Sequence, residues 1–173
     1  TLMAAAEQNR SFIGIGLFYH KAYLQQHISE TGEQTDGEMV IESEEAGLEL
    51  VTNPDMSPLI VEVPLYDRKV KVKAWKKMIQ NVTLLLLDTH VEENGIQDHN
   101  ICNQLYAGDK EHRLKQELIL GIGGVRMLEA LNIEPTHYHL NEGHAGFAIM
   151  QVIYQRRKEF KHTESFAQSQ EYI

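Results

Sequence analysis

The longest apolar runs of the sequence predict two buried strands, with a helix ahead of the first. Residues 1–9 have the composition of a helix and lead into the apolar run 12–19, which two glycines interrupt. That pattern is typical of a buried parallel strand that another backbone approaches closely. The run 81–89 lacks alternation, which indicates a strand covered on both faces, and it ends in a polar cluster at 88–90. Open α/β sheets place ligands just beyond such strand ends.

Between these two runs, polar residues and turn formers predict a more open region. Residues 30–49 are polar and acidic, so we interpret them as a surface loop, and a proline-containing turn follows at 53–58. Residues 59–65 and 70–75 flank a turn at 67–69 and are expected to form two strands. The second strand alternates apolar residues with lysines, which predicts one wet face. We expect these lysines to solvate that face rather than to form an anion site.

A long helix is predicted from Lys110 to a turn at 132–135. Its apolar residues recur at three- and four-residue steps and form one face: Leu114, Leu118, Ile122, Val125 and Leu128. Three glycines lie near its middle: Gly121, Gly123 and Gly124. Each glycine costs ~1 kcal/mol relative to alanine in a helix, so the cluster indicates close packing against another backbone.

The remaining elements and their order predict the fold class. A short strand is expected at 136–140, and residues 141–144 then turn into a helix that carries Phe147, Ile149, Met150 and Ile153. Another helix is expected at 164–173. Alternating β and α elements, with an antiparallel β excursion near the middle, predict an α/β fold with a mainly parallel sheet. The 173 residues suffice for one domain. Because residue 1 is not methionine and both ends have the composition of interrupted helices, we expect a piece of a longer protein.

Composition and charge narrow the classes of function. The formal net charge of −9 disfavours binding to nucleic acid or to an anionic membrane surface. No stretch approaches the ~20 apolar residues of a membrane span, and the first residues do not form a secretory signal. The single cysteine, Cys102, excludes an intramolecular disulfide and fits a reducing compartment such as the cytoplasm.

The histidines do not have the spacing of a metal site. His137 and His139 share a face of the expected strand, but His144 lies beyond a turn, with Glu142 between them. The zinc-protease pattern His-Glu-x-x-His is absent, so we expect no metal. Cys102 matches no nucleophile signature, and neither glycine cluster fits a nucleotide-binding fingerprint.

A polar cluster at the expected strand-to-helix junction is the strongest candidate site. Asn141, Glu142 and His144 are residue types whose directional donors and acceptors bind sugar hydroxyls. They favour a site for a polar small molecule. The residues alone support equally well a helix cap made by Asn141 with incidental neighbours.

Four segments in order resemble the α-glucan phosphorylases, in particular the shorter bacterial and archaeal members. The matching segments are residues 14–26, 84–89 with 92–94, 105–109 with 113–117, and 139–147. They extend over roughly residues 12–150. Ala22 stands where the family usually has glycine, and Gly146 where alanine or another small residue is common. A glycine-rich loop, a Thr-His-Thr element and the C-terminal domain of the family have no counterpart in the sequence.

The resemblance implies a fold and a place in it. The chain, residues 1–173, would be a single partial domain, a segment of the N-terminal Rossmann-like domain of a GT-B glycosyltransferase. The implied reaction is reversible phosphorolysis of terminal α-1,4-glucosidic bonds to glucose 1-phosphate. The implied partners are an α-1,4-glucan and phosphate, with no nucleic acid or membrane, and a homo-oligomer stays open for the intact protein.

The resemblance also assigns residues. Asn141, Glu142 and His144 would line the glucosyl pocket, and Asp109 would lie on the loop that gates it. The family uses pyridoxal 5′-phosphate, whose anchoring lysine would lie outside this chain, so the segment would hold no catalytic or coenzyme-binding residue. We therefore expect the chain alone to be inactive.

Two other classes of function remain open. One is another GT-B glycosyltransferase, such as a glucan synthase that uses a sugar nucleotide, and it would carry its diphosphate site in a C-terminal half. The other is a non-catalytic carbohydrate-binding module. Such modules usually expose several aromatic residues, whereas aromatic residues make up 8% of this sequence, with one tryptophan.

Overall fold

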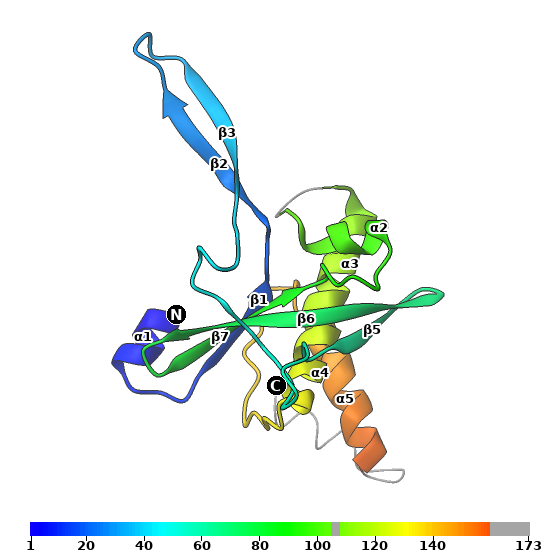
Figure 1. The fold of residues 1–173 in the computed structure, drawn as a ribbon. Coiled ribbons are helices and arrows are strands. Elements are labelled where there is room, and N and C mark those ends of the chain that lie inside the picture. Colours follow the sequence, from blue (N-terminus) through cyan, green and yellow to red (C-terminus); the bar gives the residue numbers. More distant parts are fainter. Residues whose placement is uncertain (105–107, 160–173) are drawn as a thin grey trace.

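The computed structural model describes residues 1–104 and 108–159 (Figure 1), with the backbone alone at 22–26, 35–39, 158 and 159. The helix predicted at 164–173 lies outside the described residues. The same holds for residues 105–107 of the segment that contains Asp109.

The main sheet has five strands in the order β1-β7-β6-β4, with β5 also paired to β6. The strands are β1 (Ile13–Leu17), β4 (Glu49–Leu50), β5 (Val61–Leu65), β6 (Arg68–Ile79) and β7 (Val82–Asp88). β1 and β7 are parallel, whereas β4, β5 and β7 all pair antiparallel with β6. The α/β class is therefore confirmed, but the described sheet is mixed rather than mainly parallel. The reason is the length of β6, whose 12 residues give three strands an antiparallel partner.

Helices lie on both faces of β1, as a buried strand requires. A Cβ built on Gly14 would lie 2.6 Å from Cδ2 of Leu2 in helix α1 (Leu2–Glu7), on one face. The next residue, Ile15, points to the other face, where its Cγ2 lies 3.3 Å from the corresponding Cβ position of Gly124. The predicted close approach at Gly14 is thus real, although the neighbour is a side chain rather than a backbone.

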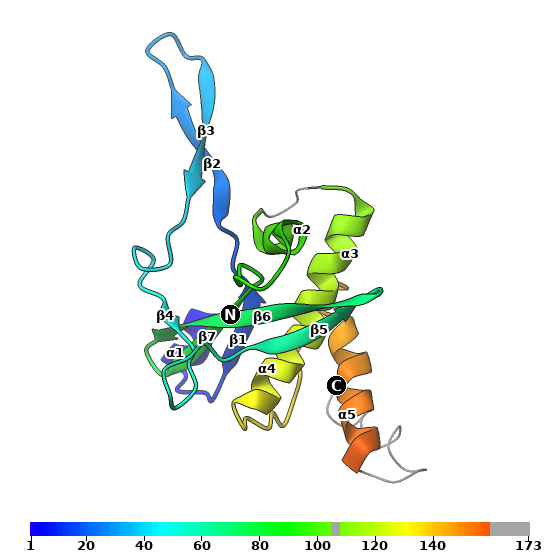
Figure 2. The ribbon, with the colours of Figure 1, turned by 45° about the vertical axis from the view of Figure 1, so that its right-hand side comes forward.

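One continuous helical rod crosses the sheet (Figure 2). It consists of α3 (Lys110–Leu118), a π-helical segment (Ile119–Gly123) and α4 (Gly124–Ala130). The long predicted helix is confirmed, and its end is marked by the left-handed φ of 54° at Asn132. Helix α5 (Phe147–Glu159) lies beside the rod, while α2 (Ile96–His99) and a 3-10 turn (Asn100–Cys102) precede it.

The core lies between the rod and the sheet. β5 and β6 alternate buried and more exposed residues, so their apolar side chains face the rod. Each apolar side chain contributes ~1.5–3 kcal/mol when fully buried. The core residues that are 0% exposed are Val63, Leu65, Val70, Val72, Ala74, Leu87, Cys102, Ile119 and Met127.

The second sheet is a hairpin that corrects the prediction of a loop at 30–49. β2 (Lys21–Ile28) and β3 (Gln34–Val40) pair antiparallel and extend away from the body (Figure 1). A turn closes the hairpin, with Ser29 N donating to Glu33 O at 2.8 Å and Gly32 at a φ of 82°. The pairing depends on backbone hydrogen bonds, which the polar and acidic composition of this segment does not reveal.

The strand predicted at 136–140 is wrong. These residues have no strand structure, although they follow the rod as expected. A strand requires a neighbour for its N–H and C=O groups, and none of the described strands pairs with this segment.

In the part of the chain that the structure describes, no helix is long and apolar enough to cross a membrane.

Two turns were predicted with different success. The turn at 53–58 is confirmed, since Asn53 N donates to Ser57 O at 2.8 Å and Asp55 Oδ1 accepts from Ser57 N at 3.0 Å. The turn between β5 and β6 is shorter than predicted. It consists of Tyr66 and Asp67, with Tyr66 at a φ of 53°, and β6 already begins at Arg68.

Candidate functional site

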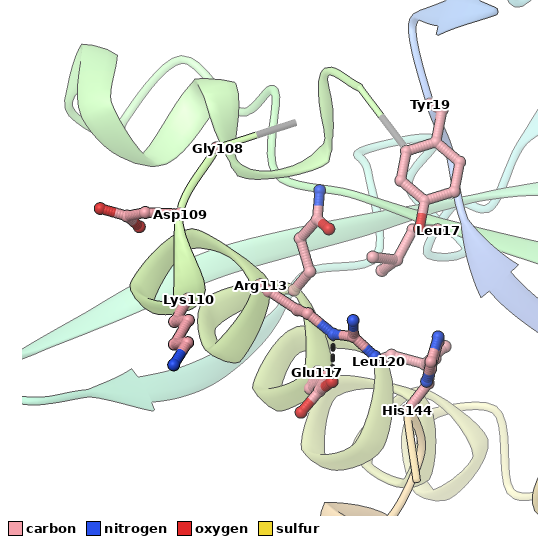
Figure 3. Close-up of a pocket in the computed structure, with 10 residues that line it drawn as sticks. Leu17, Tyr19, Gly108, Asp109, Lys110, Arg113, Glu117, Leu120 and His144 are labelled. Atoms are coloured by element: carbon pink, nitrogen blue, oxygen red, sulfur yellow. Dashed lines mark hydrogen bonds and ion pairs between the residues drawn. The ribbon is translucent and has the colours of Figure 1, made fainter. Parts of the chain in front are cut away.

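A cavity of about 380 Å³ lies at the carboxyl end of β1, between that strand end, α3 and the turn before α5 (Figure 3). Three separate parts of the chain therefore contribute to its walls. The lining residues are Leu17, Tyr19, Gly108, Asp109, Lys110, Arg113, Gln116, Glu117, Leu120 and His144.

The start of α3 determines which side chains face this cavity. Asp109 is the N-cap of α3, and its carboxylate accepts a hydrogen bond from the backbone N–H of His112 at 3.0 Å. This hydrogen bond holds the pKa of Asp109 below its ordinary value. Once the helix has begun, residues three and four positions apart share a face, which aligns the lining residues Arg113, Gln116, Glu117 and Leu120.

The charges around the cavity cancel. Lys110 and Arg113 are cationic, while Asp109 and Glu117 are anionic. Arg113 Nε donates to Glu117 Oε1 at 3.1 Å. A wall with balanced charge and many donors and acceptors suits a neutral ligand rich in hydroxyl groups better than a strongly charged one.

Gln116 anchors this wall to the body of the protein. It is buried, and its Nε2 donates to the carbonyl oxygens of Ile101 at 2.8 Å and Gln104 at 3.0 Å. Its amide is therefore used internally, which leaves the charged neighbours on the same helix face to meet a ligand.

His144 lies on the opposite wall of the cavity. The side chain of Arg113 extends toward it in Figure 3. Among the residues that the structure describes, Nδ1 of His144 is buried and has no hydrogen-bond partner. A buried nitrogen without a partner is energetically costly, so among the described residues His144 is a cavity-lining side chain whose hydrogen bonding is incomplete.

The structure brings together two of the four residues predicted to bind substrate. Asp109 and His144, from segments 35 residues apart in the sequence, line the same cavity. Asn141 and Glu142 are exposed and do not line it, and Glu142 has a left-handed φ of 58°. Asn141 does not cap α5, because it lies six residues before the first residue of that helix, Phe147.

Sequence comparisons find relatives of this chain among known enzymes. The chain is 40% identical to maltodextrin phosphorylase of Thermococcus litoralis over 152 residues, which are 88% of the chain and 18% of that protein. It is 37% and 33% identical to glycogen phosphorylases of Mycobacterium tuberculosis and Aquifex aeolicus, over 84% and 85% of the chain. The chain resembles a segment of the α-glucan phosphorylases.

The chain matches only a part of each of these relatives. The chain spans 18% of the glycogen phosphorylase of Mycobacterium tuberculosis and 21% of that of Aquifex aeolicus, so it corresponds to about a fifth of the curated relatives' length. No family model matches the chain, and no solved structure matches it.

Sequence reasoning missed part of the cavity of this phosphorylase-like segment. Arg113 and Glu117 had no predicted role, although their opposite charges at a four-residue spacing are a recognisable helix pair. Leu17 and Tyr19 were expected only as strand residues. Alternation along β1 and its continuation places both on the face of Ile15, toward the rod.

A second polar cluster lies at the carboxyl ends of β1 and β7, on the face of the sheet opposite the helical rod. Its centre is Asp88, which is 0% exposed. The carboxylate accepts hydrogen bonds from His20 Nε2 at 3.0 Å, Trp75 Nε1 at 2.9 Å and His90 N at 2.9 Å, and Lys73 Nζ lies at 3.5 Å. The polar cluster predicted at 88–90 therefore uses its central carboxylate inside the protein rather than for a ligand.

The pKa of Asp88 reflects these contacts. Burial by itself would raise the pKa, but the hydrogen bonds from His20, Trp75 and His90 outweigh it and lower the pKa to about 2.

Two lysines of β6 form ion pairs with carboxylates of the same chain. Lys71 pairs with Glu93, and Lys73 pairs with Asp88.

Cys102 is not a candidate nucleophile. It is 0% exposed, and burial raises the pKa of its thiol to about 12. At neutral pH it is therefore a thiol rather than the reactive thiolate, as expected of a structural cysteine.

The histidines considered for a metal site are separated in the structure. His137 and His139 line a second cavity, of about 580 Å³, while His144 lines the first. Within residues 1–104 and 108–159, no group of three or more His, Cys, Asp or Glu side chains is arranged to hold a metal ion.

Proposed function

We propose that this chain is a segment of an α-glucan phosphorylase and belongs to the N-terminal Rossmann-like domain of its GT-B fold. The reaction would be reversible phosphorolysis of terminal α-1,4-glucosidic bonds, with an α-1,4-glucan and phosphate as substrates and glucose 1-phosphate as product. Similarity to enzymes named as glycogen and maltodextrin phosphorylases supports this proposal along most of the chain. Nothing in the comparisons favours a sugar-nucleotide transferase or a binding module.

The structural observation that carries the proposal is the shared cavity of Asp109 and His144. Both were assigned to the glucosyl pocket or its gate from separate motifs, and both line one space at a strand end. In this proposal, His144, which lines the cavity, hydrogen-bonds a sugar hydroxyl through its imidazole. The Arg113–Glu117 pair offers a donor and an acceptor to neighbouring hydroxyls.

Asn141 and Glu142 keep their proposed role as sugar-binding residues of the same turn. They are exposed and close to His144 in the chain, although they do not line the cavity itself. Asp109 would act at the entrance, where exclusion of water protects phosphorolysis from hydrolysis. The chain's contribution would be to bind and orient the glucosyl unit.

Five of the described lysines already have a partner within the chain. Lys69, Lys71, Lys73, Lys76 and Lys115 each pair with a carboxylate. Lys110 is exposed at the cavity rim. In the family that the chain resembles, pyridoxal 5′-phosphate supplies a phosphate for proton exchange with the substrate phosphate. We propose that its anchoring lysine lies outside this chain.

The proposal predicts a loss of activity without a loss of stability. In the phosphorylase that contains this segment, Glu142→Gln or His144→Ala should lower the rate of phosphorolysis by ~10-fold or more, about 1.4 kcal/mol. The assay is release of glucose 1-phosphate from maltodextrin and phosphate, with thermal unfolding measured in parallel. His139→Ala and Glu134→Gln, at the second cavity, are matched controls. Reduced folding with normal specific activity in the folded fraction would contradict the proposal.

The isolated chain gives a second measurement. Without coenzyme and a second domain, it should release no glucose 1-phosphate and bind maltoheptaose with a Kd on the order of millimolar. Coenzyme-dependent turnover by the chain alone would contradict the placement of the catalytic groups.

A further inference from the structure

The three glycines of the helical rod face three different neighbours. A Cβ on Gly123 would lie 3.3 Å from Cγ2 of Val63, and one on Gly124 would lie 3.3 Å from Cγ2 of Ile15. Both neighbours are side chains of the sheet. Gly121 differs, because it faces helix α5 instead of the sheet.

The contact of Gly121 is with backbone. A Cβ at this position would lie 2.7 Å from Ala148 N, 2.8 Å from Phe147 Cβ and 2.9 Å from Phe147 C. These distances are shorter than real Cβ contacts. A backbone cannot move aside by a change of rotamer, so any residue other than glycine must displace the first turn of α5.

The π-helical segment brings Gly121 to this position. It spans Ile119–Gly123, in the middle of the rod, and π turns are frequent at functional sites. The neighbouring residue in this segment, Leu120, lines the cavity. The same turn therefore supports α5 and forms part of the cavity wall.

The first turn of α5 and the turn that contains His144 form one hydrogen-bonded stretch of chain, residues 143–148. Ala148 N donates to Ala145 O at 2.9 Å, and Gly146 N donates to Gly143 O at 3.0 Å. His144 takes part in neither bond, but both of its chain neighbours, Gly143 and Ala145, do. We therefore expect a shift of Ala148 to move Ala145 and, through the covalent chain, His144.

We propose that Gly121 is a positioning residue for His144. By letting the backbone of α5 rest directly on the π turn, Gly121 places the turn before α5 so that His144 reaches the cavity opposite Arg113. The role of His144 toward sugar rests on the proposed function. The placement of His144 by Gly121 does not.

The test compares Gly121→Ala with Gly123→Ala in the full chain. The two substitutions are identical, lie in the same turn and replace glycine by a better helix former, but only the first meets α5. The chain is labelled with ¹³C-histidine, and the His144 imidazole signal is assigned by its loss in His144→Gln. Gly121→Ala should shift the His144 signal and weaken maltoheptaose binding at least fivefold. Gly123→Ala should leave both near wild type.

An unmoved His144 signal in folded Gly121→Ala would overturn the proposal, and so would equal shifts in the two variants. If the signal moves in Gly121→Ala alone but the wild-type chain binds no maltoheptaose, the positioning role stands and the sugar-binding function fails. Should Gly121→Ala be unstable, all spectra are recorded in trimethylamine N-oxide, which favours the folded state equally for the matched control.

Discussion

Two polar groups lie at the carboxyl ends of β1 and β7, one on each face of the sheet, and they differ in how fully their atoms are used. On the face of α1, Asp88 is 0% exposed and receives three hydrogen bonds and a nearby ammonium. On the face of the rod, the side chain of Arg113 is 59% exposed with Glu117 as its partner, and His144 Nδ1 has no partner among the described residues.

The difference separates a structural polar cluster from a binding site. A buried carboxylate with every lone pair engaged has nothing left for a ligand, and it instead fixes the strands and loops that donate to it. A cavity with unfilled hydrogen-bonding groups contributes little to folding and retains its capacity to bind. Strand-end position alone, which both groups share, does not tell them apart.

The largest expected effect is on the structural side of this comparison. Asp88→Ala should lower the free energy of unfolding by ~3 kcal/mol or more, because it removes a fully buried carboxylate that accepts from Trp75, His90 and His20. Urea unfolding measures the change. Asp67→Ala, which removes a carboxylate that is 91% exposed, is the control and should stay within ~0.5 kcal/mol of wild type. Equal effects of the two variants would contradict the comparison.

An intermediate effect is expected from pH. The folded pKa of Asp88 is about 2, below the ordinary 3.8, so its stabilisation is present above pH 4 and is lost as the pH falls from 4 toward 2. The difference between these two pKa values corresponds to about 2 kcal/mol of folding stability. Urea unfolding across this range should show that loss in the wild type and much less of it in Asp88→Asn. Parallel pH profiles for the two proteins would show that other carboxylates dominate.

The smallest effect on stability is expected at the cavity. Arg113→Gln removes an exposed i,i+4 ion pair, which is worth about 0.3–0.5 kcal/mol. Its effect on unfolding should therefore stay within that range, while maltoheptaose binding weakens. Thermal or urea unfolding checks the first part. A loss above ~1.5 kcal/mol would place Arg113 with the structural cluster instead of the binding site.

Local hydrophobic pattern predicted the elements that bury a face. The apolar run at β7 and the alternation of β6 led to the correct strands, because burial and sequence period agree there. The hairpin strand β3 was missed, since backbone pairing leaves no such pattern in a polar segment. The strand expected at 136–140 failed for the opposite reason, as its pattern is suitable but no described strand pairs with it.

The site was predicted from residue types and resemblance, and its geometry was not. His144 and Asp109 line one cavity because the fold brings the turn before α5 close to the start of α3, and local spacing does not encode this proximity across 35 residues. The partners of Asp88 come from positions 20, 73, 75 and 90, so nothing in the sequence around Asp88 distinguishes it from a ligand-binding carboxylate.

The π-helical segment has a consequence for the angular phase of the rod. A π turn accommodates one residue more than an α turn, and one residue corresponds to about 100° of rotation around a helix axis. α3 and α4 therefore share an axis but not a phase. This offset lets α3 direct charged residues to the cavity while α4 directs Met127 and Leu128 into the core. In a regular helix with one residue fewer, the two faces would no longer match their surroundings at the same time.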